Sequence, residues 1–189
     1  MRIRCIHHST EKFFKKKFEY EFFETYETDL IIGKEYNVYG LIYYNDIYKY
    51  LIFDENNTPF WYLNKLFEII DNKISKFWYL DFLKEESLIS AMWGYYELVN
   101  IENHNDDLMK ENKDNLEEKE KAALDIFYQR KKEMDLEFPD DSIKEKASIV
   151  DNNWLMCPTC VDAWESNSIF AMIECPKCKK VMHNPRNKK

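Results

Sequence analysis

Residues 36–53 read YNVYGLIYYNDIYKYLIF. Two runs rich in β-branched and aromatic residues, 36–44 and 47–53, flank the polar pair Asn45-Asp46. Runs of this composition favour extended strands, and a two-residue polar turn between two of them is typical of a β-hairpin. The sequence therefore predicts that an antiparallel hairpin starts the fold.

Further short strands are predicted on both sides of this hairpin. The turn-forming segment 54–59 contains Asn56, Asn57 and Pro59, and it is followed by apolar runs at 60–63, 67–70 and 77–80. Residues 2–7 give one more strand before the hairpin. Brief strands separated by turn signals indicate a small antiparallel sheet that curls on itself. We therefore predict a small β-barrel-like core in the β-rich region 30–80.

Residues 33–71 carry a resemblance to a known group of folds. In the stretch GKEYNVYGLIYYNDIYKYLIFDENNTPFWYLNKLFEIID, a Gly-Lys-x-Tyr strand and a hairpin lead into a Trp-Tyr segment and then a Leu-Phe-Glu segment. This order resembles the small SH3-like barrels of uncharacterised bacterial proteins. The resemblance implies a barrel-like fold and an immunity-type or partner-binding role, and it transfers no functional residue.

The period of the apolar residues changes after residue 84. Apolar side chains then recur every three or four positions, which predicts a helix that Gly94 interrupts; they are Leu88, Ala91, Met92, Tyr95 and Leu98. A second helix is predicted from Asp114, with an inward face made by Leu116, Ala123, Phe127 and Met134, and it ends before Pro139. The fold class is thus α+β, with two helices packed on the β core.

The predicted domain organisation has three parts. Residues 1–138 form the α+β domain, which is β-rich over 30–80 and helical over 84–137. Residues 139–152 form a linker, and residues 153–189 form a separate cysteine-containing module.

Four of the five cysteines occur as two paired motifs in this last part. They are Cys157-Pro-Thr-Cys160 and, after fourteen residues, Cys175-Pro-Lys-Cys178. Each C-x-x-C places two thiolates on one side of a turn, and two facing turns supply the four ligands of a tetrahedral zinc ion. The sequence therefore predicts one Zn²⁺ site formed by Cys157, Cys160, Cys175 and Cys178.

The two motifs resemble those of the zinc-ribbon family, although Val161 and Lys179 stand where many ribbons have glycine. Four thiolates close the coordination shell, so the predicted zinc is structural rather than catalytic. Iron in the same site and disulfides remain alternatives, and His183 is an alternative ligand.

No other set of residues points to catalysis, and we predict that the protein is not an enzyme. Cys5, His7 and His8 lack a third group that would orient a nucleophile and its base. Pairs of acids, such as Glu85-Glu86, Asp106-Asp107 and Glu117-Glu118, are typical of solvated loops and helix starts.

Charge is unevenly distributed along the chain. Residues 1–150 contain 21 basic and 31 acidic residues, whereas residues 151–189 contain 6 basic and 4 acidic residues. An acidic body repels a phosphate backbone and suits a basic protein partner. Together with the many aromatic residues, this predicts a non-catalytic protein-binding protein, of an immunity or inhibitor type. The alternative is a nucleic-acid-binding module that uses the ribbon and the basic tail, which consists of Lys177, Lys179, Lys180, Arg186, Lys188 and Lys189.

The compartment is predicted from two absences. The N-terminal residues MRIRCIHHST lack the apolar run of a secretory signal, and no run reaches the roughly 18 apolar residues that cross a membrane. We therefore expect a cytoplasmic protein without membrane contact.

Overall fold

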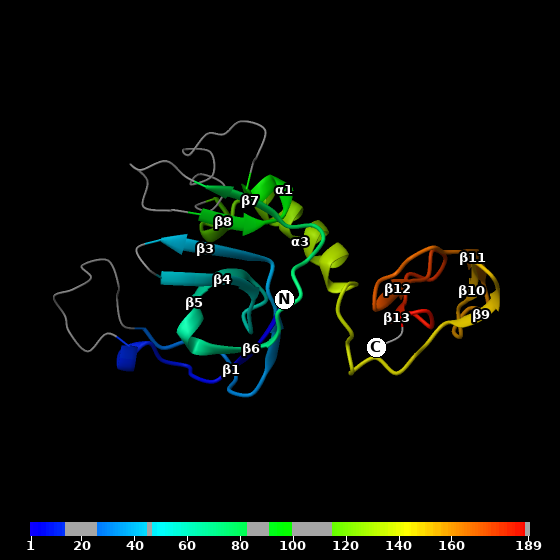
Figure 1. Cartoon of the computed structure of the whole chain (residues 1–189), viewed down its shortest axis with the longest axis horizontal. Helices are drawn as coiled ribbons and strands as arrows, with labels where there is room; N and C mark the ends of the chain where they lie inside the picture. Colours follow the sequence, from blue (N-terminus) through cyan, green and yellow to red (C-terminus); the bar gives the residue numbers. More distant parts are fainter. Residues whose placement is uncertain (14–25, 45–46, 83–90, 100–114, 188–189) are drawn as a thin grey trace. The chain divides into compact units, whose positions relative to one another are not determined.

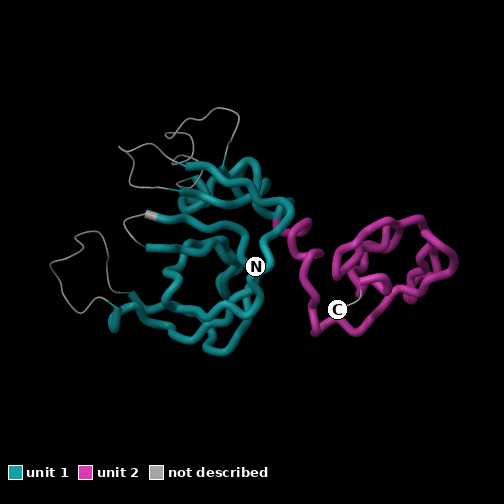
Figure 2. Tube along the Cα trace, viewed as in Figure 1, with its two compact units in different colours: residues 1–130 teal, residues 131–189 magenta. Residues whose placement is uncertain are grey.

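The computed structural model describes residues 1–13, 26–44, 47–82, 91–99 and 115–187. The described chain is mixed and mostly β, with few helices. It divides into two compact units, residues 1–130 and residues 131–189, called here the N-terminal unit and the C-terminal unit (Figure 2). The boundary between them falls within a helix, α3 (Lys121–Asp135).

The N-terminal unit contains a five-stranded antiparallel sheet with the order β5-β4-β3-β8-β7 (Figure 1). The predicted hairpin is confirmed, because β3 (Gly40–Tyr44) pairs with β4 (Ile47–Phe53) and Tyr44 lies opposite Ile47. β5 (Pro59–Leu63) pairs with the other side of β4. Beyond β3, the sheet continues with β8 (Ala91–Gly94) and ends with β7 (Tyr79–Phe82).

A second sheet has three antiparallel strands. β1 (Arg2–Cys5) lies between β2 (Glu35–Asn37) and β6 (Phe67–Asp71). The Arg4 guanidinium joins all three strands, since it donates hydrogen bonds to Glu35 and Glu68, both at 2.9 Å. Exposed ion pairs of this kind contribute about 0–1 kcal/mol each, so this network supports the strand register more than it adds stability.

The five-stranded sheet lies between the three-stranded sheet and helix α3. Alternate residues of a strand point to opposite faces, so Tyr50 and Ile52 of β4 join the core shared with β1 and β6, while Phe53 faces α3. The buried Phe127 of α3 lies with its ring centroid 5.3 Å from that of Tyr39 and 6.2 Å from that of Phe53. The core between the sheets consists of Met1, Ile3, Cys5, Leu30, Tyr36, Val38, Ile47, Tyr50, Ile52, Tyr62, Leu63, Leu66 and Phe67.

The two sheets are not closed into a barrel, which corrects the predicted barrel-like core. Residues 36–44 were expected to form one strand, but β2 ends at Asn37 and β3 begins at Gly40. The chain changes sheet at the buried residues Val38 and Tyr39. Because one hydrophobic run serves two sheets, the strands form layers instead of a continuous ring.

The predicted helix over residues 84–98 is wrong in the part that the structure describes. Residues 91–94 form the strand β8, and only Tyr96–Val99 form a helix, the single turn α1. β8 is an inner strand between β3 and β7, and its adjacent residues Ala91 and Met92, which point to opposite faces of the sheet, are both buried. Burial on both faces, followed by one helical turn, produced the three- and four-residue spacing that indicated a helix.

The second predicted helix is present as α3, and its predicted inward residues Phe127 and Met134 are buried. Ala123 is half-buried, and Leu116 is buried but lies before α3. The helix therefore starts later than predicted, at Lys121, because the chain turns at Lys119, whose φ is 61°. The predicted start at Asp114 lies outside the described residues. Two short 3₁₀ turns complete the N-terminal unit, at Glu11–Phe13 and Asn64–Leu66.

The C-terminal unit holds two small antiparallel sheets. In the first, β10 (Trp154–Met156) lies between β9 (Ser148–Asp151) and β11 (Ala163–Glu165). In the second, β12 (Met172–Glu174) pairs with β13 (Val181–His183). β9 falls within the range 139–152 that was predicted as a linker. The core of this unit is small and consists of Ala147, Leu155, Cys157, Ile173, Cys175 and Met182.

Candidate metal centre

Two chain reversals of the same design carry the paired cysteines. Cys157 follows β10, and its N–H donates to the carbonyl oxygen of Asp162 at 2.9 Å. Cys175 follows β12, and its N–H donates in the same way to the carbonyl oxygen of Lys180 at 2.9 Å. Each reversal, called a knuckle below, thus joins two strands of its own sheet and holds two thiols on one side.

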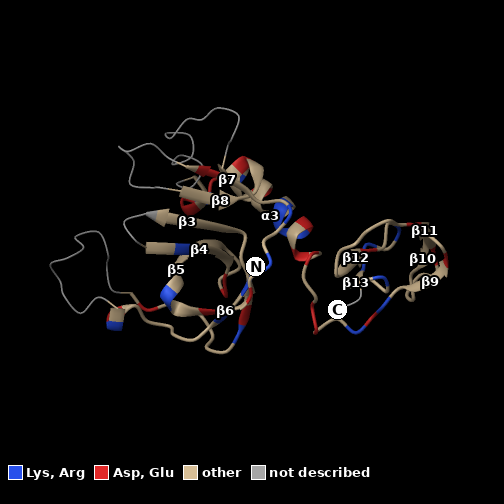
Figure 3. Cartoon of the chain, viewed as in Figure 1, with Lys and Arg blue, Asp and Glu red and all other residues tan. Residues whose placement is uncertain are grey.

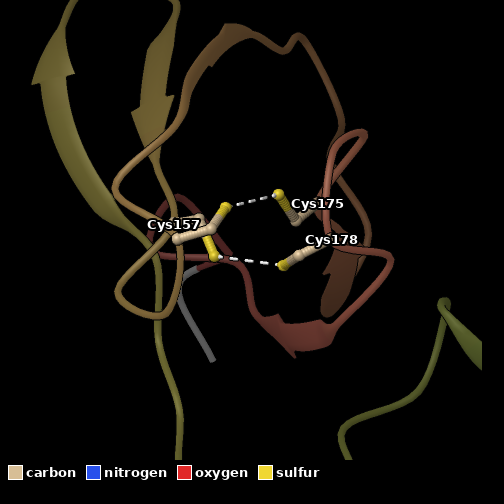
Figure 4. Close-up of side chains that lie close together, drawn as sticks. Cys157, Cys175 and Cys178 are labelled. Carbon is tan, nitrogen blue, oxygen red and sulfur yellow. Dashed lines mark hydrogen bonds between the residues drawn. The ribbon is translucent and has the colours of Figure 1, made fainter.

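The four thiols converge on one point. Their sulfur atoms all lie within 4.8 Å of one another. The Sγ atoms of Cys157 and Cys178 are 3.7 Å apart, and those of Cys160 and Cys175 are 3.6 Å apart (Figure 4). A tetrahedron with metal–sulfur distances of about 2.3 Å has edges of about 3.8 Å. The spacing therefore fits four sulfur ligands around a single ion, so this group can hold a metal.

The same distances bear on the disulfide alternative. All five cysteines of the chain are free thiols in the structure. Sulfur separations of 3.6 and 3.7 Å are far longer than the roughly 2.05 Å of a disulfide bond. The geometry is consistent with a zinc ribbon.

The backbone and the neighbouring thiols shift the pKa values of the first knuckle in opposite directions. Burial of Cys157 raises the pKa of its thiol, but the N–H groups of Cys160 and Thr159 and the neighbouring thiols lower that pKa to about 6. The N–H of Asp162 lowers the pKa of Cys160, whereas burial and the three other thiols raise it to about 12. The Cys157 thiol therefore ionises readily, whereas Cys160 does not, because a second negative charge close to the first is unfavourable. A divalent cation removes this conflict, and its binding releases protons.

Both knuckles contain a residue with positive φ that is not glycine. Val161 has a φ of 59° and Lys179 a φ of 62°, and their N–H groups donate to the carbonyl oxygens of Cys157 and Cys175 at 3.0 and 2.9 Å. A left-handed conformation costs a residue with a side chain about 1–2 kcal/mol, and it is least suited to a β-branched residue such as Val161. Both positions, where many zinc ribbons have glycine, therefore carry backbone strain.

The other residues singled out in the sequence do not join this cluster. The His183 imidazole makes a hydrogen bond of 2.8 Å to the carbonyl oxygen of Ile143, so it is engaged away from the thiols. In the N-terminal unit, the buried Cys5 donates through its thiol to the carbonyl oxygen of His7 at 3.2 Å, while His8 is exposed. His104 and the acidic pairs Glu85-Glu86 and Asp106-Asp107 lie outside the described residues.

Three of the basic side chains near the C-terminus that the structure describes make contacts within the unit. Lys177 forms an ion pair with Asp162 at 3.3 Å, and Lys179 forms one with Glu174 at 3.7 Å. Figure 3 shows such basic residues interspersed with acidic ones. Arg186 donates to the backbone carbonyl oxygens of Ser166 and Asn152.

Sequence reasoning missed the residues that fasten the end of the chain. Asn184 is buried, and its amide donates to the carbonyl oxygens of Ser168 and Phe170 at 2.8 and 2.9 Å. Its side-chain oxygen accepts a hydrogen bond from the N–H of Arg186 at 3.0 Å. A buried asparagine near a chain end follows no periodic pattern, and the Asn184-Pro185 pair was the only signal for a turn there.

Comparison with known proteins assigns the chain to no family: no protein-family model, curated protein or solved structure matches it. None of these comparisons therefore supports the resemblance of residues 33–71 to SH3-like barrels. Within the described ranges, no helix has both the length and the apolar character that crossing a bilayer requires.

Proposed function

We propose that the protein is a non-catalytic protein-binding protein, whose C-terminal unit is a ribbon held together by one structural zinc ion. Cys157, Cys160, Cys175 and Cys178 would hold the ion. Four sulfur ligands at tetrahedral spacing fill the coordination shell of zinc, so no position remains for a water molecule or a substrate. The proposed role of the metal is therefore to fold the unit.

The observation that carries the binding role is an exposed apolar strand in the C-terminal unit. All four residues of β9 are exposed, including Ile149 (55%) and Val150 (56%), and Trp154 on the neighbouring strand β10 is 46% exposed. β9 is also an edge strand, so one side of its backbone has no partner strand in its sheet. Exposed apolar residues on a sheet edge are costly for a monomer in water and typical of a protein-binding surface.

The charge of the N-terminal unit favours a basic protein as the partner. Residues 1–130 contain 17 basic and 25 acidic residues, a balance of −8. A surplus of acids steers basic partners toward the chain and repels nucleic acid. This balance supports an inhibitor or immunity type of role, in which the protein neutralises a basic target.

The proposal is tested by recovering partners from cells of the natural source. A tagged full-length chain is expected to retain one protein in stoichiometric amount. The variant Ile149→Ser/Trp154→Ser should lose this protein at least tenfold, whereas Ile74→Ser, which changes an exposed isoleucine of the N-terminal unit, should retain it. Recovery of no stable protein partner by the unaltered chain would refute the proposal.

Binding of nucleic acid through the ribbon and its tail has less support. Lys177 and Lys179 are paired with carboxylates, and Arg186 is held by carbonyl oxygens. Phosphate contacts would have to displace these bonds. A gel-shift assay at low salt separates the two roles, because phosphate binding would be strongest there and would fall steeply with added salt.

A further inference from the structure

A polar depression on the C-terminal unit is not used by the metal centre. Its volume is about 440 Å³. It is lined by Asn153 from the β9–β10 turn, by Asn167, Ser168 and Ile169 from the segment before β12, and by Arg186 and Asn187 near the end of the chain. Three segments that are distant in sequence therefore meet around it.

Arg186 provides a positive charge that is held in place. Its guanidinium donates to the carbonyl oxygen of Asn152 at 2.6 Å and also to that of Ser166. These contacts use two of the five N–H donors of a guanidinium. No carboxylate of the described residues forms an ion pair with Arg186, and no acidic residue lines the depression. The charge is therefore positioned without being neutralised.

The other walls are neutral, and one of them is apolar. Among the described residues, the side-chain amides of Asn153 and Asn167 have no hydrogen-bond partner, so they can donate to and accept from a ligand. The Ser168 hydroxyl accepts a hydrogen bond from the N–H of Phe170 at 3.2 Å and retains its own proton for donation. The Ile169 side chain is 81% exposed, and it offers an aliphatic surface beside these polar groups.

From this arrangement we infer that the depression binds the carboxyl terminus of a partner protein that ends in an aliphatic residue. One guanidinium matches the single charge of a carboxylate, and Arg is well suited to planar carboxylate recognition. The amides of Asn153 and Asn167 suit the preceding peptide group, and Ile169 suits the terminal side chain. A phosphate dianion would keep part of its charge uncompensated and would gain nothing from Ile169. This inference rests on the proposed protein-binding function and names the part of the partner that is recognised.

The inference is tested with small carboxylates on the full-length, zinc-loaded protein. N-acetyl-leucine carries one carboxylate, one amide and one aliphatic side chain, and N-acetyl-leucinamide is its uncharged counterpart. In a titration followed by ¹H–¹⁵N NMR, N-acetyl-leucine is expected to shift the signals of Asn153, Asn167 and Ile169. For so small a ligand, a dissociation constant on the order of millimolar is expected. The amide and inorganic phosphate should bind at least tenfold more weakly.

Two charge-changing variants test the depression without disturbing the fold. Asn167→Asp places a negative charge at the depression without removing a bond of the fold, and it should weaken binding of N-acetyl-leucine at least tenfold. Lys146→Asp makes a charge change at an exposed site of this unit that does not line the depression, and it should leave binding unchanged. Equal binding of the amide, equal or tighter binding of phosphate, or no shift with any probe would overturn the inference. If Asn167→Asp still retains the partner recovered from cells, the inference fails while the protein-binding function stands.

Discussion

Removal of the metal is expected to unfold the C-terminal unit and to leave the N-terminal unit intact. The buried cluster around the cysteines contains three large aliphatic side chains, Leu155, Ile173 and Met182. Burial of such a side chain contributes about 1.5–3 kcal/mol, so the three together contribute about 5–9 kcal/mol. A structural zinc ion contributes about 10–16 kcal/mol in small zinc domains at neutral pH. A zinc ion would therefore contribute more stability than this cluster, and we expect the strands around the cysteines to unfold without it.

The assay follows both units in one sample. Metal analysis of the pure, untagged chain should give one zinc ion per molecule. After removal of zinc with a chelator under reducing conditions, the ¹H–¹⁵N NMR signals of Leu155, Ile173 and Met182 should collapse to random-coil positions. The signals of Leu51 and Trp61, which are buried in the N-terminal unit, should stay dispersed.

Two variants separate loss of a ligand from loss of any cysteine. Cys160→Ser should give the collapsed C-terminal spectrum and lose the bound metal. Cys5→Ala, which removes the one cysteine outside the cluster, should keep one zinc ion per molecule. A dispersed C-terminal spectrum after complete loss of metal, or pure protein that never contains metal, would refute the reasoning.

Three further changes test the backbone, the packing and the ion pairs. Replacement Val161→Gly should relieve about 1–2 kcal/mol of strain, partly offset by the greater flexibility of glycine, and raise the melting temperature of the zinc-loaded C-terminal unit; an unchanged or lower value would contradict the strain. The variant Gly94→Ala should destabilise the N-terminal unit by about 1–3 kcal/mol in urea unfolding, because an added Cβ would lie 2.7 Å from Leu98 Cδ2; a neutral result would show that Leu98 moves freely. Glu97 accepts hydrogen bonds from Arg130 at 2.6 and 2.9 Å, which lower the pKa of its carboxyl group below the usual value. A carboxyl group whose pKa is lowered in the folded state stabilises the fold above its unfolded-state pKa, and this stabilisation is lost as the pH falls. Replacement Glu97→Gln should therefore lower the free energy of unfolding by about 0.5–1 kcal/mol at pH 7 and by almost nothing near pH 3. An equal loss at both pH values would exclude the charge of Glu97 as its cause.

The four-cysteine cluster was predictable from the sequence because its signal is local. Each C-x-x-C fixes two thiols within one turn, so only the meeting of the two knuckles had to be assumed. The hairpin at residues 36–53 was predictable for the same reason, since Asn45-Asp46 separates two runs of strand-forming residues. In both cases, the residues that determine the structure are neighbours in the chain.

The parts that failed depend on contacts between distant segments. β8 was mistaken for a helix because its strand partners are distant in the sequence, β3 about fifty residues earlier and β7, and because both of its faces are buried. Gly94, which was taken as a helix breaker, lies opposite Gly40 in the sheet, where both leave room for Leu98. Likewise, nothing near Val38 and Tyr39 marks the change of sheet, because these residues have the same strand-forming character as their neighbours.

The repeated backbone pattern of the knuckles bears on how the C-terminal unit assembles. Each reversal closes its own pair of main-chain bonds, Cys157 with Asp162 and Val161, and Cys175 with Lys180 and Lys179. The two cysteines of one reversal could therefore bind an ion before the other reversal has formed. To complete the site, the cysteines of the second reversal would then have to meet the first pair across fourteen residues, a short span whose closure costs little chain entropy. Assembly in two such local steps would allow zinc to bind early, before the surrounding strands have paired.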